Sequence, residues 1–230
     1  MRHTPARPSL AQGFLGILML ETRFPRPPGD IGNPETFARA GIPVRFAVVA
    51  GASPARIVQA ADPNLLRPFV DAAVRLAAEG ARIISTSCGF LARYQSDLAA
   101  AVRVPVWTSS LLECRRFTRP GIVTFDRVAL GRAVLWAAGV ADGTPVEGLD
   151  PGCELHRRIL SNDDVLDLEA AERNVVAAAR RLVARHPSVT DLVLECTNMP
   201  PYRDAVARAT GRGVHDIETL LIQAWSALPP

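Results

Sequence analysis

The chain has 230 residues, of which 48% are hydrophobic, and its formal net charge is +3. That length allows one large domain or two lobes of about 110 residues each, with enough apolar side chains for a buried core. All 26 basic residues are arginine, so the chain lacks the lysine that pyridoxal phosphate enzymes, Schiff-base aldolases and P-loop proteins require. The charge is spread along the chain, which argues against a nucleic-acid partner and leaves a small anionic substrate as the candidate ligand.

The four cysteines do not form a metal or redox motif. Cys88, Cys114, Cys153 and Cys196 are 26, 39 and 43 residues apart, and neither CxxC nor a Cys/His zinc spacing occurs, so no metal is expected. Disulfides are not expected at this size and cysteine density. No apolar run reaches the roughly 18 residues that cross a bilayer. We expect a cytoplasmic protein without a membrane partner, and its oligomeric state stays open, with a homo-oligomer as one option.

Strand-like and helix-like segments alternate after a loose tail over residues 1–12. The first half predicts strands at 13–20, 44–50, 83–87 and 104–108, helices at 64–79 and 91–102, and a short helical connection through Cys114. The second half predicts strands at 121–124, 144–148, 191–195 and 214–215, helices at 127–138, 165–185, 202–209 and 217–228, and no clear period over 150–162. The proline-rich stretch 21–34 predicts a loop at the end of a strand, where ligands bind in α/β sheets. The alternation is typical of parallel, doubly wound sheets.

A weak internal repeat joins the two halves. A shift of 108 residues places Cys88 on Cys196, Tyr94 on Tyr202, Val106 on Val214, and Gly13-Phe14-Leu15 on Gly121-Ile122-Val123. We therefore predict an α/β protein of two Rossmann-like lobes with parallel sheets related by a pseudo-twofold axis. The first lobe is 1–112 plus 213–230 and carries Cys88, and the second is 113–212 and carries Cys196. This arrangement would bring the two cysteines to face each other across a cleft.

Each of these two cysteines comes where a strand ends and a helix begins. The backbone N–H groups and the helix dipole at such a corner stabilise negative charge by roughly 0.3 to 1 kcal/mol, which predicts a thiol pKa lowered from about 8.5 toward neutrality. The N–H groups of Gly89 and Phe90, or of Thr197 and Asn198, are candidates for binding a substrate carboxylate. Two opposed thiols suggest that one removes a proton from a carbon while the other supplies one to the opposite face. Such a reaction inverts a stereocentre without a cofactor.

Other polar residues near these corners have simpler interpretations. The remaining two cysteines are expected to be small buried hydrophobes. For His215, at a strand end, both a general acid/base role and a structural role stay open. Asp30 and Asn33 are typical of turn caps. Glu195 directly precedes Cys196, and strand alternation would point it away, so no role is assigned to it.

Three segments together resemble a known family. STSCGF around Cys88, LECTNMPPY around Cys196 and GIVT ending at Thr124 resemble the cofactor-independent aspartate/glutamate/hydantoin racemase superfamily, and the likeness runs over nearly the whole chain. The resemblance implies two Rossmann-like lobes, a substrate between them, and one cysteine from each lobe as the acid/base pair. It also implies that Thr124 contacts the substrate carboxylate, that Thr197 matches a family threonine, and that the loop around Asn33 replaces the family's first substrate loop.

The chain also departs from that family pattern. Gly89-Phe90 stands where family members usually have Asn-Thr, and Asn198 stands where glutamate racemases usually have His. These changes argue against free glutamate, and Phe90 favours a bulkier or less polar substrate. We predict a racemase or epimerase of an amino acid or amino-acid derivative. The alternatives are a one-cysteine relative, either an arylmalonate-type decarboxylase or a maleate-type cis–trans isomerase, and a non-catalytic two-lobed binding protein.

Overall fold

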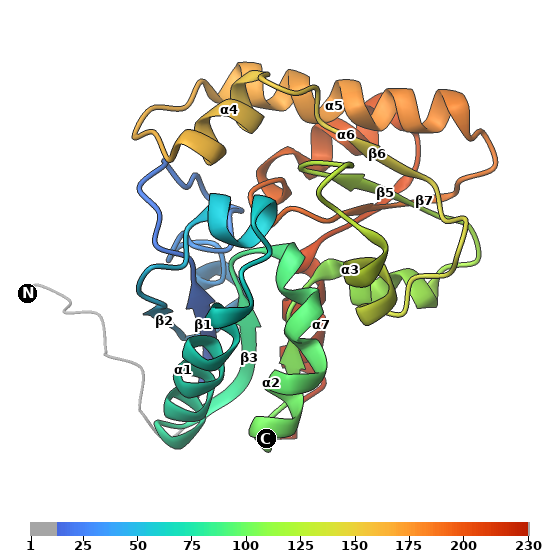
Figure 1. Cartoon of the computed structure of the whole chain (residues 1–230). Coiled ribbons are helices and arrows are strands. Elements are labelled where there is room, and N and C mark those ends of the chain that lie inside the picture. The colour runs from blue at the N-terminus through green and yellow to red at the C-terminus, as the bar shows by residue number, and fades with distance from the viewer. Residues whose placement is uncertain (1–12, 230) are drawn as a thin grey trace, which may run out of the picture.

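The computed structural model describes residues 13–229, so the predicted tail over residues 1–12 lies outside the described residues. The described strands form two four-stranded parallel sheets with the orders β2-β1-β3-β4 and β6-β5-β7-β8. The second order repeats the first when its strands are numbered from β5. Helices flank both sheets (Figure 1). The predicted α/β fold with parallel sheets is confirmed.

The bounds of the elements are as follows. The first sheet contains β1 (Phe14–Met19), β2 (Val44–Val48), β3 (Ala81–Thr86) and β4 (Val106–Trp107), and the second contains β5 (Pro120–Thr124), β6 (Val146–Gly148), β7 (Asp191–Leu194) and β8 (Gly213–His215). The α-helices are α1 (Leu66–Ala78), α2 (Gln95–Ala101), α3 (Arg132–Ala137), α4 (Glu154–Ser161), α5 (Leu168–Arg185), α6 (Arg203–Thr210) and α7 (Ile217–Ser226). Shorter helical turns occur at Ala38–Ala40, Ala55–Gln59, Pro63–Leu65, Gly89–Tyr94, Ser110–Arg116 and Pro200–Tyr202.

The first strand is buried on both faces, as parallel sheets require. Leu15, Ile17 and Met19 pack in one apolar cluster, whereas Phe14 and Leu18 point into the larger core on the other face. This larger core also contains side chains from the second sheet, so one apolar interior joins the two sheets.

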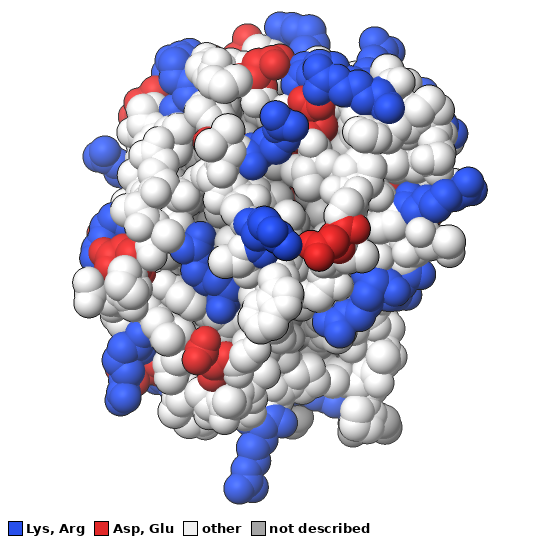
Figure 2. Space-filling model, turned by 45° about the vertical axis from the view of Figure 1, so that its right-hand side comes forward, with Lys and Arg blue, Asp and Glu red and all other residues white. Residues whose placement is uncertain are grey.

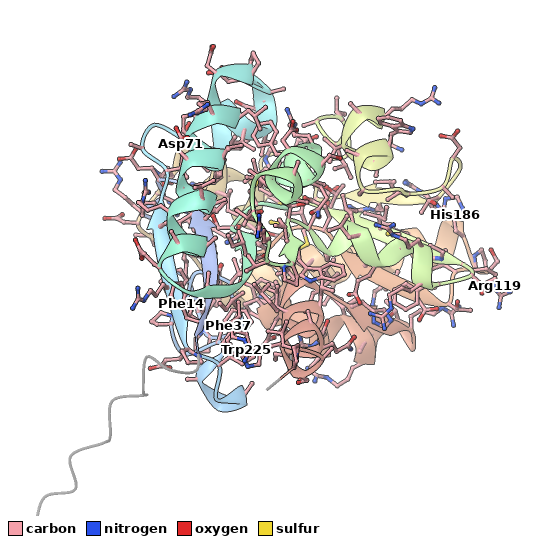
Figure 3. The ribbon with its side chains drawn as sticks, turned by 90° about the horizontal axis from the view of Figure 1, so that it is seen from below. Phe14, Phe37, Asp71, Arg119, His186 and Trp225 are labelled. Carbon is pink, nitrogen blue, oxygen red and sulfur yellow. The ribbon has the colours of Figure 1, made fainter. Side chains whose placement is uncertain are left out.

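The last helix crosses from one sheet to the other. β8 hydrogen-bonds to β7 of the second sheet, whereas Ile217 and Leu220 of α7 pack in the cluster beside β1. Figure 3 shows Phe37 and Trp225 lying close together where α7 covers the first sheet. The division of the chain into lobes at residue 213 stays a prediction. After that residue β8 pairs in the second sheet, whereas α7 packs on the first.

The strand registers correct the predicted repeat. Ile84 of β3 and Leu192 of β7 are 108 positions apart and hold equivalent places, each opposite the last strand of its sheet. On the other side, Gly16 pairs with Ile84 and Gly121 pairs with Leu192. Gly121 therefore corresponds to Gly16 and not to Gly13, so the predicted alignment of the first strands is wrong by three residues.

The two matched glycines share a packing reason. A Cβ at Gly16 would lie 3.0 Å from Cδ1 of Leu76 in α1, and a Cβ at Gly121 would lie 2.6 Å from Cδ2 of Leu182 in α5. Each glycine lets a helix approach the first strand of its sheet closely. The repeat is therefore a repeat of helix-on-sheet packing as well as of sequence.

Two predicted segments differ in the structure. The helix predicted over 127–138 is shorter, since Asp126 Oδ1 accepts the N–H groups of Val128 and Ala129 at 2.8 and 3.0 Å and turns the chain before α3. The segment 150–162, without a clear period in the sequence, contains α4. Four of the eight residues of α4 are charged or histidine, so its apolar face is difficult to recognise in the sequence.

Within the described residues, no helix is both long and apolar enough to cross a membrane. Arginine side chains are scattered among acidic and uncharged residues over the face shown in Figure 2, without forming a continuous basic block there.

Candidate active site

A small cavity lies at the carboxyl ends of the two central strands. β3 ends at Thr86 and β7 ends at Leu194, and the corners that follow, 87–90 and 195–198, both line the cavity. Ligands in open α/β sheets bind at this end of the strands. The two cysteines predicted to face each other therefore share one cavity. It offers about 20 Å³ to the centre of a water-sized sphere, which is room for about one water molecule.

The two thiols have matched surroundings. The N–H group of Phe90 stabilises a negative charge on Cys88, and the N–H group of Asn198 does the same for Cys196. The predicted effect of the corner is thus present, but burial opposes it. Burial, followed by the nearby Glu195 carboxyl, raises the pKa of Cys88 to about 12 and raises that of Cys196 well above its ordinary value. The expectation of thiol pKa values near neutrality is wrong, because desolvation outweighs the backbone N–H groups.

A hydrogen-bonded chain leads from Cys196 to the loop after β1. The Cys196 thiol donates to Asn198 Oδ1 at 3.5 Å, and Asn198 Nδ2 donates to Asp30 Oδ2 at 2.5 Å. Asp30 Oδ1 also accepts from Arg26 Nη1 at 2.7 Å and from the Gly32 N–H group at 2.8 Å. Asp30, whose role the sequence leaves open, is 1% exposed and fixes the orientation of the Asn198 amide.

Glu195 lies in the cavity wall, whereas strand alternation predicts that it points away. Its Oε2 accepts from the Thr124 hydroxyl at 2.8 Å and from the Phe125 N–H group at 3.4 Å. Its Oε1 is buried and has no hydrogen-bond partner among the described residues. Burial raises the pKa of Glu195 to about 7. A Cβ at Gly89 would lie 2.3 Å from Oε1, so only glycine at that position lets the carboxyl group reach across from β7 to the corner of β3.

Glu195 does not follow the alternation of β7, because this strand ends one residue earlier, at Leu194. Beyond the last paired residue a side chain no longer has to follow the pleat of the sheet. One signal in the sequence could have found it. The acid stands in the otherwise apolar run LVLEC, where an uncompensated charge is costly unless it has a function or a partner.

Four predicted substrate-binding residues lie in the cavity wall, namely Gly89, Phe90, Thr197 and Asn198. The Thr197 hydroxyl is used within the protein, since it donates to the backbone oxygen of Ser87 at 2.7 Å and joins the two corners.

Two predicted substrate contacts are not in the cavity wall. The Asn33 amide donates to the backbone oxygen of Arg26 at 2.6 Å and accepts from the Glu35 N–H group at 2.8 Å, so it holds the loop together. The Thr124 hydroxyl donates to Glu195 Oε2. His215 is also structural: it pairs with Asp191 at 3.1 Å and stacks on Phe117 with ring centres 4.1 Å apart.

Arg26 is the basic residue in the cavity wall. Its guanidinium donates to Asp30 and, at 2.8 Å, to the Thr22 hydroxyl, and lies 4.5 Å above the centre of the Phe24 ring. With the N–H groups at the two corners, it can attract a carboxylate. Within the described part of the chain, no group of three His, Cys, Asp or Glu side chains is placed to hold a metal ion.

Comparison of the structure with solved structures defines the class of fold. Unliganded arylmalonate decarboxylase aligns with a TM-score of 0.57 and 16% identity over 94% of this chain and 92% of that one. Allantoin racemase from Pseudomonas fluorescens aligns with a TM-score of 0.58 and 15% identity over 94% and 90%. The chain therefore has the fold of the aspartate/glutamate racemase type.

The relatives found by sequence comparison are named for a different activity from that of the solved structures. No protein-family model matches the chain. Dimethylsulfoniopropionate lyase of Durusdinium sp. clade D is 29% identical over 224 residues, which cover 91% of this chain and 73% of that protein. Dimethylsulfoniopropionate lyase 7 of Emiliania huxleyi (strain CCMP1516) is 29% identical over 228 residues, which cover 89% of this chain and 64% of that protein. The chain thus spans about two thirds of the length of these relatives.

Proposed function

We propose that the protein is a cofactor-independent enzyme in which a cysteine removes the proton next to a substrate carboxylate, and that its reaction is elimination from a β-sulfonio acid of the dimethylsulfoniopropionate type. The observation that carries the proposal is the pair of thiols in one buried cavity beside Arg26, each with a backbone N–H group at its corner. The likeness to dimethylsulfoniopropionate lyases over nine tenths of the chain supports the choice of substrate. Because of this likeness, we place elimination ahead of inversion as the reaction.

In this mechanism the substrate carboxylate lies near Arg26 and the N–H groups of the two corners. One cysteine, as a thiolate, takes a proton from the carbon next to the carboxylate. The C–H electron pair forms a carbon–carbon double bond, the C–S bond breaks, and its electrons leave with dimethyl sulfide. Acrylate remains, and the cysteine returns its proton to solvent, so that one substrate gives dimethyl sulfide, acrylate and one proton.

The test is release of dimethyl sulfide from dimethylsulfoniopropionate, measured by headspace gas chromatography with the purified protein. Cys88→Ser and Cys196→Ser are made singly, and loss of the base should lower kcat by at least about a hundredfold. Cys153→Ser is the matched control, since this thiol begins α4 outside the cavity wall, and it should keep full activity. Elimination is contradicted if the wild-type protein releases no dimethyl sulfide, or if both single variants are as active as the control.

The two thiols also support a second candidate, the racemase or epimerase of an amino acid or amino-acid derivative. They follow strands of different sheets, β3 and β7, and line the same cavity, which supports a two-base inversion. The same proteins are incubated in heavy water with acidic amino acids, aromatic amino acids and hydantoins. Deuterium at the α-carbon, lost in both cysteine variants, would favour inversion over elimination.

A further inference from the structure

We propose that the Glu195 carboxylate and the aromatic rings around it bind a positively charged group of the substrate, so that the site selects zwitterions with a sulfonium or quaternary ammonium centre. This inference rests on the proposed function and adds a specificity-determining residue to it. Elimination requires only a base and a place for the carboxylate. It does not by itself require a buried acid.

The first observation is the unpartnered oxygen of Glu195. The side chain is fully buried in the cavity wall, and both of its donors, the Thr124 hydroxyl and the Phe125 N–H group, go to Oε2. Oε1 has no partner among the described residues. Buried carboxylate oxygens nearly always have one. The missing partner is therefore expected from a ligand that enters the cavity.

The aromatic side chains around the cavity indicate which kind of ligand this is. Phe24, Phe90 and Phe125 line it together with Glu195, and Phe125 is fixed by stacking on His156 with ring centres 4.8 Å apart. Phenylalanine rings give no conventional hydrogen bond, but their faces attract cations, and methylated onium groups are bound in this way. A carboxylate among such rings suits a cation that has no N–H group of its own.

The charge of Glu195 also connects such a cation to the chemistry. This charge adds to burial in raising the pKa of both Cys88 and Cys196. A cation beside Glu195 would offset its effect on the thiols and make a thiolate easier to form. Binding of the correct substrate would thus help to prepare the base that acts on it.

Two ligands that differ only in charge provide the test. 3-(Trimethylammonio)propanoate and 4,4-dimethylpentanoate have the same shape and the same carboxylate, but only the first carries a positive centre. Isothermal titration calorimetry measures the dissociation constant of each. We expect the wild-type protein to bind the ammonium ligand at least about tenfold more tightly.

The variant Glu195→Gln removes the charge with little change in shape. Its amide oxygen can still accept from Thr124 and Phe125, and its amide NH₂ group takes the place of the unpartnered oxygen. The matched control is Glu113→Gln. Glu113 is 2% exposed and also has an unpartnered oxygen, but it lies in the helical turn Ser110–Arg116 outside the cavity wall. We expect the preference for the cation to fall below about threefold in Glu195→Gln and to be unchanged in the control.

The inference is overturned if the wild-type protein binds both ligands equally, if Glu195→Gln keeps the wild-type ratio, or if the ammonium ligand does not bind at about 10 mM. Folding of both variants is checked by thermal unfolding. The outcome is independent of turnover. Release of dimethyl sulfide without charge preference would sustain the proposed function and reject the subsite, whereas charge preference without release would do the reverse.

Discussion

At the scale of single residues, Glu195 is a carboxyl group whose surroundings oppose its charge. One of its oxygens is satisfied by Thr124 and Phe125, the other has no partner among the described residues, and burial raises the pKa to about 7. Functional sites commonly hold groups in environments that cost stability. The cost should be measurable.

We predict that Glu195 makes the protein less stable as the pH rises from about 4.5 to 7. In this range the folded state binds the proton of Glu195 and the unfolded state has lost it, so the free energy of unfolding falls with pH. The two cavity thiols stay protonated here because their pKa values are raised. Glu195→Gln should therefore be more stable than the wild-type protein at pH 8, by up to about 3 kcal/mol, and should differ little at pH 4.5. Urea unfolding at the two pH values measures this, and equal pH slopes would contradict it.

Gly89 provides a second prediction at this scale. A Cβ there would lie 2.2 Å from the backbone oxygen of Glu195 and 2.3 Å from Oε1, so Gly89→Ala must push the two corners apart. We expect a loss of about 3 kcal/mol in the free energy of unfolding and loss of activity. Gly131→Ala is the control, because its nearest atom is 3.9 Å away and its φ is −68°. A variant Gly89→Ala as stable as this control would contradict the close approach.

The sequence could place the cysteines but not the ionisation of their thiols. Their positions follow from the strand-to-helix corners and the repeat, and both lie in one cavity. Their pKa values depend on how much protein surrounds them and on the Glu195 carboxyl. The extent of burial and the reach of Glu195 to the corner of Cys88 arise from tertiary packing, so the spacing of residues along the chain does not give them.

At the scale of elements, the apolar strands were predictable and the polar helix α4 was not. Each predicted strand overlaps an observed one. The signal is clearest for the central strands β1, β3, β5 and β7, which are largely buried and therefore form nearly continuous apolar runs. In α4, by contrast, Glu154 pairs with Arg157 at 2.6 Å and with Arg158 at 2.9 Å. Because α4 is mostly polar, the few buried residues through which it packs on the protein are difficult to recognise in the sequence.

The helix α4 also helps to close the cavity. Ile159 lines the cavity, and Asn162 Oδ1, at the end of α4, accepts the N–H group of Arg23 at 2.7 Å from the loop after β1. Figure 1 shows this loop rising toward α4. Since the cavity holds about one water molecule, entry of a substrate requires this cover to move.

We predict that Asn162→Gly loosens the cover without unfolding α4. Asn162 has a φ of 55°, which glycine adopts easily, so only the contact to Arg23 is lost. Association of 3-(trimethylammonio)propanoate, followed by stopped-flow fluorescence, should become about threefold faster, and its dissociation faster still. Ala61→Gly is the control, as Ala61 also has a positive φ, 48°, away from the cavity wall. Unchanged rates in Asn162→Gly would contradict a cover held by this bond.

At the scale of the whole molecule, the two sheets share one apolar core and are joined at the site. Leu18 and Val123, from the first strands of the two sheets, belong to the same cluster. The Thr197 hydroxyl donates to Ser87, and the Ser110 hydroxyl donates to the backbone oxygen of Leu194 at 2.7 Å. Each of these bonds connects the end of a strand in one sheet, or the segment after it, to the segment that follows a strand of the other sheet.

We therefore predict that the two halves unfold together. Thermal unfolding followed by far-ultraviolet circular dichroism and by tryptophan fluorescence should give one transition with the same midpoint. The circular dichroism reports on both sheets, whereas the fluorescence reports mainly on the first, since Trp107 is in β4, Trp225 of α7 packs beside β1, and Trp136 in α3 is 84% exposed. Two separate transitions would show that the halves are independent domains.

The two corners differ in charge at the residue that precedes each thiol. Ser87 precedes the first thiol, and the acid Glu195 precedes the second and crosses to the opposite corner. A zwitterion whose cationic end is held there can therefore lie in the cavity in only one direction. The two hydrogens on its methylene carbon would then face different thiols, and an eliminating enzyme of this design would remove one prochiral hydrogen and leave the other in the acrylate.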